Sequence, residues 1–145
     1  MRSPLNNSST PSKFTRGART TGRVLLGLVF LVCGLNGFLN FLPQPKGPIP
    51  EGALALGGAL MKAGYMFPLI KGTEVAAGAL LLANRFVALA LVIIAPVIVN
   101  IVAFHAFLAP SGLGLACVLA ALAIHLAWVH RAAYRPLFAT ARPAR

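Results

Sequence analysis

The chain carries four long runs of apolar residues, at 24–42, 67–83, 86–108 and 112–129. Apolar residues follow one another in these runs without the alternation that marks a half-exposed strand. At about 1.5 Å per residue, each run has roughly the length that crosses the hydrocarbon core of a bilayer, and the run at 67–83 is the shortest. Because a backbone in hydrocarbon has to satisfy its own hydrogen bonds, the runs predict four transmembrane helices.

Short breaks separate the runs. Residues 43–50 contain prolines at every second or third position, which exclude a continuous helix there. Residues 51–64 begin with an acid and end with a glycine, a pattern typical of a short helix that lies at the membrane interface. The turns at 84–85 and 109–111 are so short that the helices they join have to be antiparallel neighbours. The prediction is an all-α fold, a four-helix transmembrane bundle with a short interfacial helix between the first and second spans.

Composition supports lipid as the solvent of this chain. Hydrophobic residues make up 58% and charged residues 10%, whereas soluble domains have roughly 25% charged residues. The acidic residues are Glu51 and Glu74. A surface that faces water cannot be built from so few charges. The phospholipid bilayer is therefore the expected partner of the membrane domain.

The net charge of +11 has a clear distribution along the chain. Most of the basic residues precede the first run or follow the last run: Arg2, Lys13, Arg16, Arg19, Arg23, Arg131, Arg135, Arg142 and Arg145. Arg85 lies in the turn between the second and third runs. Lys46 and Lys62 fall on the other side of the membrane. The positive-inside rule then predicts a multi-pass membrane protein with both termini in the cytoplasm, and the resemblance described below places it in the bacterial cytoplasmic (inner) membrane. Because the basic residues flank apolar runs, the charge indicates anionic lipid headgroups and not nucleic acid.

Three segments follow from these patterns. Residues 1–22, rich in Ser, Thr, Pro and Arg, are expected to form a disordered basic cytoplasmic tail. Residues 23–137 form the predicted membrane domain, and 138–145 a second basic cytoplasmic tail. Cys33 and Cys117 show no C-x-x-C spacing, and no haem, flavin or metal-binding motif is recognised.

Six polar residues in three of the predicted spans fall in one layer of the membrane. Counted from the outer ends of their runs, they lie between about 3 and 12 Å below the outer boundary: Asn36, Asn40, Lys71, Glu74, Asn100 and His105. Asn36 and Asn40 are four residues apart and so share one face of their helix. Lys71 and Glu74 are three residues apart and share a face of the next helix. Ionisable residues inside a membrane default to function, so the layer predicts a polar ligand-binding pocket open to the outer face. The alternative is that these groups only join the helices through hydrogen bonds.

Several stretches that contain these residues resemble the DoxX family of bacterial membrane proteins. They are Gly34-Leu35-Asn36-Gly37 with Phe38 and Pro43, Gly64-Tyr65-Met66-Phe67-Pro68-Leu69-Ile70-Lys71 with Glu74, Asn84-Arg85-Phe86, and Ala95-Pro96 through Asn100 to Phe104-His105. The resemblance covers about 23–137. It implies a four-helix membrane fold, and some relatives form part of a thiosulfate:quinone oxidoreductase while others are associated with redox defence. The residues that carry over are Asn36, Lys71, Glu74, Asn100 and His105.

The layer and the resemblance together favour an accessory or quinone-proximal membrane subunit of a redox system, which works with redox partner proteins and is not a complete enzyme alone. Glu74 and His105 are the candidate proton handlers, and Asn36 and Asn100 the candidate donors to a quinone carbonyl. Since no cofactor motif is recognised, thiosulfate oxidation itself is not carried over. The alternative is a non-catalytic membrane scaffold or lipid-binding protein, with homo-oligomers left open.

Overall fold

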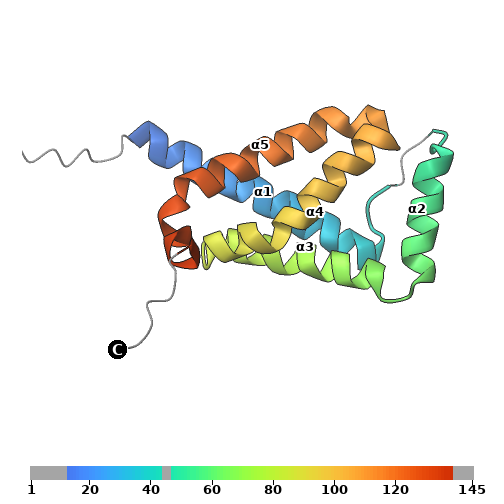
Figure 1. The fold of residues 1–145 in the computed structure, drawn as a ribbon, viewed down its shortest axis with the longest axis horizontal. Helices are drawn as coiled ribbons and strands as arrows, with labels where there is room; N and C mark the ends of the chain where they lie inside the picture. Colours follow the sequence, from blue (N-terminus) through green and yellow to red (C-terminus); the bar gives the residue numbers. More distant parts are fainter. Residues whose placement is uncertain (1–12, 44–46, 139–145) are drawn as a thin grey trace, which may run out of the picture.

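The computed structural model describes residues 13–43 and 47–138, and every regular element in these ranges is a helix (Figure 1). The elements in chain order are α1 (Lys13–Leu39), α2 (Glu51–Lys62), α3 (Met66–Leu82), α4 (Val87–Phe107), the 3-10 helix η1 (Pro110–Gly112), α5 (Leu113–Val129) and the 3-10 helix η2 (Arg131–Phe138). The predicted all-α class is confirmed for this part of the chain, and a helix follows the proline-rich loop as expected.

Three segments are long and apolar enough to cross a membrane, Gly17–Leu39, Val87–Phe107 and Pro110–Val129. The helix α3 has 17 residues, about 26 Å at the usual rise per residue. It joins α2 through a bend of 93°, and the bent pair taken as one span raises the number of candidates to four. The chain therefore has three to four candidate membrane-spanning helices, which is compatible with a multi-pass membrane protein.

The first helix begins earlier than the sequence predicted. Residues 13–22 belong to α1, where composition predicted an irregular tail, so this part of the prediction is corrected. A nucleated helix extends at little further cost in free energy, and the Lys, Arg and Ala residues of this stretch have favourable helix propensity. The rest of that predicted tail, 1–12, lies outside the described residues, as does 139–145 of the predicted C-terminal tail.

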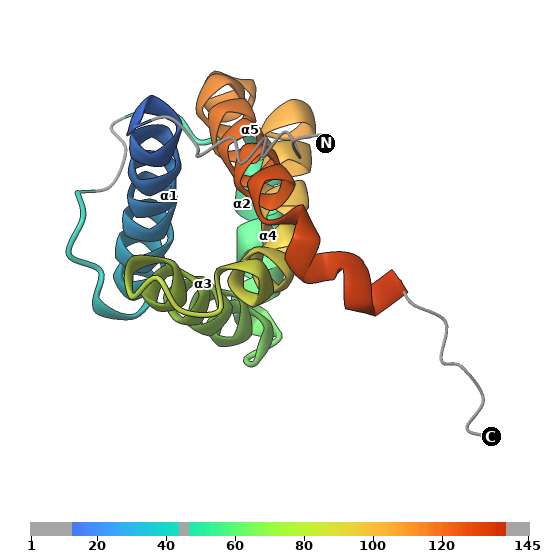
Figure 2. The ribbon, with the colours of Figure 1, turned by 90° about the vertical axis from the view of Figure 1, so that its left-hand side faces the viewer.

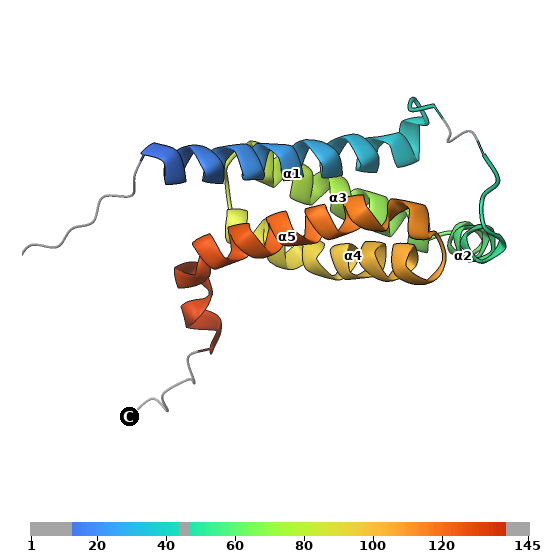
Figure 3. The same ribbon diagram turned by 90° about the horizontal axis from the view of Figure 1, so that it is seen from above.

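Four helices run side by side, and α2 lies across one end of them (Figures 1 and 3). Contacts join α1 with α3, α3 with α4, α4 with α5, and α5 back to α1, so the four close into a ring when viewed along the bundle (Figure 2). Their inward side chains form one core, in which the largest fully buried members are Phe30, Leu26, Leu81, Ile94 and Leu126. The helix α2 contacts the bundle chiefly through α3.

The outward faces of the bundle are apolar. Phe107 is 84% exposed, Ile124 70% and Trp128 68%, and many other large apolar side chains share this orientation. Contiguous apolar surface of this kind is rare on soluble monomers, whereas a helix surrounded by hydrocarbon requires it. The exposed faces of α1, α4 and α5 are therefore suited to contact with lipid.

A seam of glycines joins α1 to α3. A Cβ atom at Gly34 would lie 2.8 Å from Val75 Cγ2, and one at Gly78 would lie 2.5 Å from the backbone nitrogen of Leu31. Gly27 on α1 is similarly close to Leu81. Small residues let two helix backbones approach closely in a membrane, where packing replaces the hydrophobic effect as the source of stability. These glycines therefore let α1 and α3 lie in close contact.

The side chain of Arg23 caps the C-terminus of α3. Its guanidinium donates hydrogen bonds to the carbonyl oxygens of Leu81 and Leu82, in the last turn of the helix. Neither carbonyl has a partner within α3, although the Leu81 oxygen also accepts a hydrogen bond of 3.2 Å from the Asn84 N–H in the following turn. The helix dipole places partial negative charge at this end. The sequence assigned Arg23 only to the basic flank of the first span, so this role in joining two helices was missed.

We expect Arg23→Leu to lower the free energy of unfolding by about 2 kcal/mol, because two charge-assisted hydrogen bonds to the last turn of α3 are lost. The thermal unfolding midpoint in detergent measures the effect. Arg19→Leu is the matched control, since Arg19 is an exposed arginine one turn earlier on α1. Equal shifts for the two variants would contradict the assignment of Arg23.

Candidate functional site

The helix α3 carries an ion pair inside the bundle. Lys71 and Glu74 are three residues apart and project from one face of the helix. The Lys71 ammonium donates to both carboxylate oxygens of Glu74, at 2.9 and 3.1 Å. The Glu74 side chain is 4% exposed and that of Lys71 21%. Pairing lowers the free energy needed to keep each charge away from water.

The helix α1 makes room for this pair. A Cβ atom at Gly37 would lie 2.5 Å from the Cγ and Cδ atoms of Lys71, so the absence of a side chain there accommodates the lysine stem. The ring centroid of Phe67 lies 5.9 Å from the Lys71 ammonium, within range of a cation–π interaction. The lysine is therefore held between α1 and its own helix.

Cys33 of α1 is a neighbour of the ion pair. It lies close enough to interact electrostatically with both Glu74 and Lys71. Its thiol is free, like that of Cys117, and both cysteines are exposed on the outside of the bundle. Sequence reasoning missed this neighbour, although the signal was present. Cys33 and Gly37 are four residues apart and so share one face of α1.

The two asparagines of the first span end the helix. Asn36 Oδ1 accepts a hydrogen bond of 2.7 Å from the backbone N–H of Leu42, and the Asn36 carbonyl accepts one of 2.8 Å from the N–H of Asn40. Asn40 has a φ of 53°, in the left-handed region that asparagine tolerates better than most residues. The Asn36 side chain therefore joins the C-terminus of α1 to the turn after it, and Asn40 supplies the left-handed residue of that turn.

The polar side chains of α4 also bond to their own segment. The Asn100 amide donates to the Pro96 carbonyl at 2.9 Å, and Asn100 is exposed on the outside of the helix. The Ala109 carbonyl accepts from His105 Nδ1 at 2.9 Å. The imidazole packs against Gly112, where a side chain would collide with the ring. His105 thus holds the turn between α4 and α5.

The structure divides the six predicted site residues. It brings Lys71 and Glu74 together, whereas the side-chain hydrogen bonds of Asn36, Asn100 and His105 go to backbone atoms of their own segments. Among the described residues, no buried side-chain nitrogen or oxygen lacks a partner. The common depth of these groups therefore does not produce one shared hydrogen-bonded cluster.

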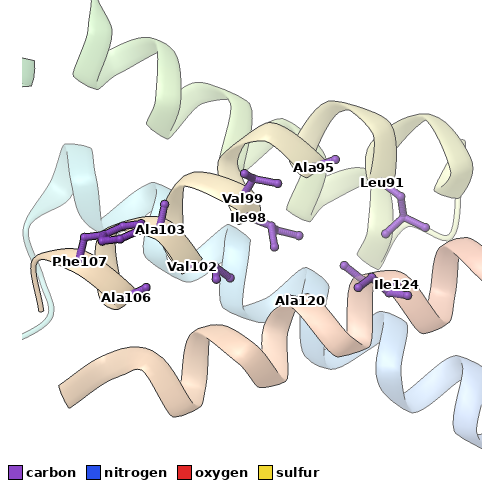
Figure 4. Close-up of a pocket in the computed structure, with 11 residues that line it drawn as sticks. Leu91, Ala95, Ile98, Val99, Val102, Ala103, Ala106, Phe107, Ala120 and Ile124 are labelled. Atoms are coloured by element: carbon purple, nitrogen blue, oxygen red, sulfur yellow. The ribbon is translucent and has the colours of Figure 1, made fainter. Parts of the chain in front are cut away.

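An apolar groove of about 490 Å³ runs between α4 and α5 (Figure 4). The helix α4 lines it from Leu91 to Phe107, and α5 lines it with Ala120, Ala123 and Ile124. Every lining residue is Ala, Val, Leu, Ile or Phe, and none of the six predicted polar residues is among them. The groove therefore presents hydrocarbon and no polar side chain to a ligand.

Sequence reasoning missed this groove. Ala120 and Ala123 of α5 line it together with Ala95, Ala103 and Ala106 of α4. Small side chains on both helices leave space between them. The signal that could have found the groove was the presence of alanines on both partners, since close packing usually sets small residues against large ones.

At the end of the bundle where α5 stops, η2 turns away from α5 and contacts α4 (Figures 1 and 2). The Tyr134 hydroxyl donates a hydrogen bond of 3.3 Å to the Ala88 carbonyl. Burial raises the pKa of the Tyr134 phenol above its ordinary value, so this donor keeps its proton at neutral pH. Arg131, the first residue of η2, lies with its guanidinium 5.4 Å from the ring centroid of Trp128.

In residues 13–43 and 47–138, no three His, Cys, Asp or Glu side chains lie close enough together to hold a metal ion. Comparison with known proteins does not identify the chain, because no family model, curated protein or solved structure matches it. The geometry of the ion pair, the groove and the basic end is therefore the basis for a functional proposal.

Proposed function

We propose that the chain is a four-span protein of the bacterial cytoplasmic membrane that binds the hydrocarbon chain of a membrane lipid in the groove between α4 and α5 and serves as a membrane scaffold. The fourth span in this proposal is α3, with α2 at the outer interface. Both termini lie on the cytoplasmic side, in keeping with the arginines that flank the spans.

The apolar groove carries this proposal. Its volume of about 490 Å³ falls within the roughly 300–1,000 Å³ that small-molecule sites occupy. A lining without polar side chains favours a saturated or isoprenoid chain over a polar ligand. Transfer from lipid into such a groove brings no gain from the hydrophobic effect, so the binding free energy comes from packing against fixed side chains.

We expect the purified chain to retain one lipid in mild detergent and Ala95→Phe to reduce that retention severalfold, because the added ring occupies the groove. Ala95 lines the groove and is exposed, so a larger side chain enters it without displacing the core. Native mass spectrometry measures the bound mass. Ala121→Phe is the matched control, an exposed alanine of α5 that does not line the groove. Unchanged retention in Ala95→Phe would end the proposal.

The second candidate is the quinone-proximal redox subunit predicted from the sequence and its resemblance to the DoxX family. The observation that favours it is the Lys71–Glu74 pair inside the bundle, because ionisable groups within a membrane commonly have a function, and Cys33 of α1 lies within electrostatic range of both charges. A quinone carries an isoprenoid chain that suits the same apolar groove. The mass of the retained molecule separates the two functions, since a phospholipid mass supports the scaffold and a quinone mass supports the redox subunit.

A further inference from the structure

The end of the bundle where α1 begins and α5 stops is strongly basic. It holds five arginines of the described chain: Arg19, Arg23, Arg85, Arg131 and Arg135. The sequence contains two acidic residues, Glu51 and Glu74. Glu51 lies in α2 at the opposite end, and Glu74 is buried in the middle of α3 with Lys71. Within the described residues, no carboxylate therefore competes for the arginines at the basic end.

One arginine at this end is held beside a residue on the groove side of α5. Ile124 of α5 lines the groove at the end nearest Leu91 (Figure 4). Trp128 follows Ile124 by four residues on the same helix face, about 6 Å further along the axis, and Arg131 lies just past the end of α5, as the first residue of η2. The Arg131 guanidinium stacks on Trp128 at 5.4 Å and donates a hydrogen bond of 3.1 Å to the Trp128 carbonyl.

These contacts give Arg131 a defined position in place of a freely moving side chain. Stacking on an aromatic ring leaves the outer N–H donors of a guanidinium able to bind an anion. The hydrogen bond from Tyr134 to Ala88 fixes η2, and with it Arg131, against the first turn of α4. Arg85 lies just before that turn, so the basic side chains flank both helices that form the groove.

We propose that this basic end selects an anionic phospholipid, whose acyl chain lies in the groove between α4 and α5 and whose phosphate binds Arg131 beside Trp128. The inference rests on the proposed function, because it takes the groove as the place of the hydrocarbon chain. Charge complementarity identifies the occupant, since basic groups without a nearby acid favour an anionic headgroup over a zwitterionic one. The guanidinium supplies paired donors that match phosphate oxygens.

Trp128 is the single tryptophan of the sequence, so its fluorescence reports directly on lipid at this site. The full chain is placed in phosphatidylcholine bilayers that contain increasing fractions of dibrominated phosphatidylglycerol or dibrominated phosphatidylcholine, and bromine next to the ring quenches the emission. We expect half-maximal quenching at an about fivefold lower fraction of the anionic lipid, the preference associated with one arginine near a charged headgroup. Raising the salt concentration should reduce that preference.

Arg131→Gln should remove the preference while leaving quenching by phosphatidylcholine in place. Lys62→Gln, which removes the same charge at the opposite end of the bundle, should retain it. Equal quenching of the wild-type chain by the two lipids would overturn the inference. An unaltered preference in Arg131→Gln would overturn it as well. A different result would contradict the proposed function and not the anionic preference: Ala95→Phe retains its lipid while the wild-type chain still prefers the anionic lipid.

Discussion

Gly78→Ala is expected to lower the free energy of unfolding by about 3 kcal/mol, the upper part of the range for overpacked sites, and to separate α1 from α3. The new Cβ atom would lie 2.5 Å from the backbone nitrogen of Leu31, 2.9 Å from the Leu31 Cα atom and 2.9 Å from the Gly27 carbonyl oxygen. All three neighbours belong to the backbone of α1, so no rotation of a side chain relieves the collision. The thermal unfolding midpoint in detergent measures the loss.

Gly72→Ala provides the control on the same helix. A Cβ atom at Gly72 meets no heavy atom within 4 Å. Alanine is a better helix former than glycine by up to about 1 kcal/mol, so this variant should be neutral or slightly stabilising. The two substitutions make the same chemical change in α3 and are expected to have opposite signs. A comparable loss in both variants would show that α3 responds to lost helix flexibility and not to contact with α1.

The apolar runs predicted the helices well because each is long and ends at strong turn signals. The runs at 86–108 and 112–129 correspond to α4 and α5 within one residue at each end. The start of α1 was missed because its first turns are polar, and a span was predicted only where apolar residues follow one another without a break. Residues 13–22 show that a helix can begin in a basic, polar stretch ahead of its apolar run.

For most of the candidate residues, the sequence predicted a common depth in the membrane but contained no signal for the direction in which each side chain points. Distance along a span gives the height of a side chain in the membrane, whereas its facing depends on the rotation of the helix about its axis. The helix α4 is apolar on all sides, so its sequence contains no signal for that rotation, and Asn100 is found on the outside. Lys71 and Glu74 were paired correctly because their contact lies within one helix and depends on spacing alone.

Asn36 and His105 illustrate a second reason why the predicted polar pocket differs from the structure. Both lie within a few residues of a helix end, where backbone groups lack partners. A short polar side chain in that position bonds to the nearest free backbone group before it can reach another helix. The sequence shows that such a residue is polar and lies in a predicted span. Whether its side chain bonds to a nearby backbone group or to another helix depends on the conformation of the adjacent turn.

Removing one member of the Lys71–Glu74 pair is expected to lower the free energy of unfolding by about 3–5 kcal/mol, because the remaining charge is left without a partner inside the bundle. Glu74→Leu leaves the Lys71 ammonium unpaired, and Lys71→Leu leaves the Glu74 carboxylate unpaired in a position with 4% side-chain exposure. The double variant Lys71→Leu/Glu74→Leu should recover to within about 1 kcal/mol of the wild type, since apolar residues replace a buried ion pair without leaving a charge. Equilibrium unfolding of all four chains gives the coupling free energy.

The double variant also separates the ion pair from the proposed lipid site. The pair lies between α1 and α3, whereas the groove is formed by α4 and α5, so a refolded double variant should retain its lipid at the level of the wild type. Losses that simply add in the double variant would show that each residue acts through other partners. Recovery of stability together with loss of the bound lipid would instead make the pair part of the binding site. A stable double variant that keeps its lipid would show that the pair is required neither for the packing of α1 on α3 nor for lipid binding.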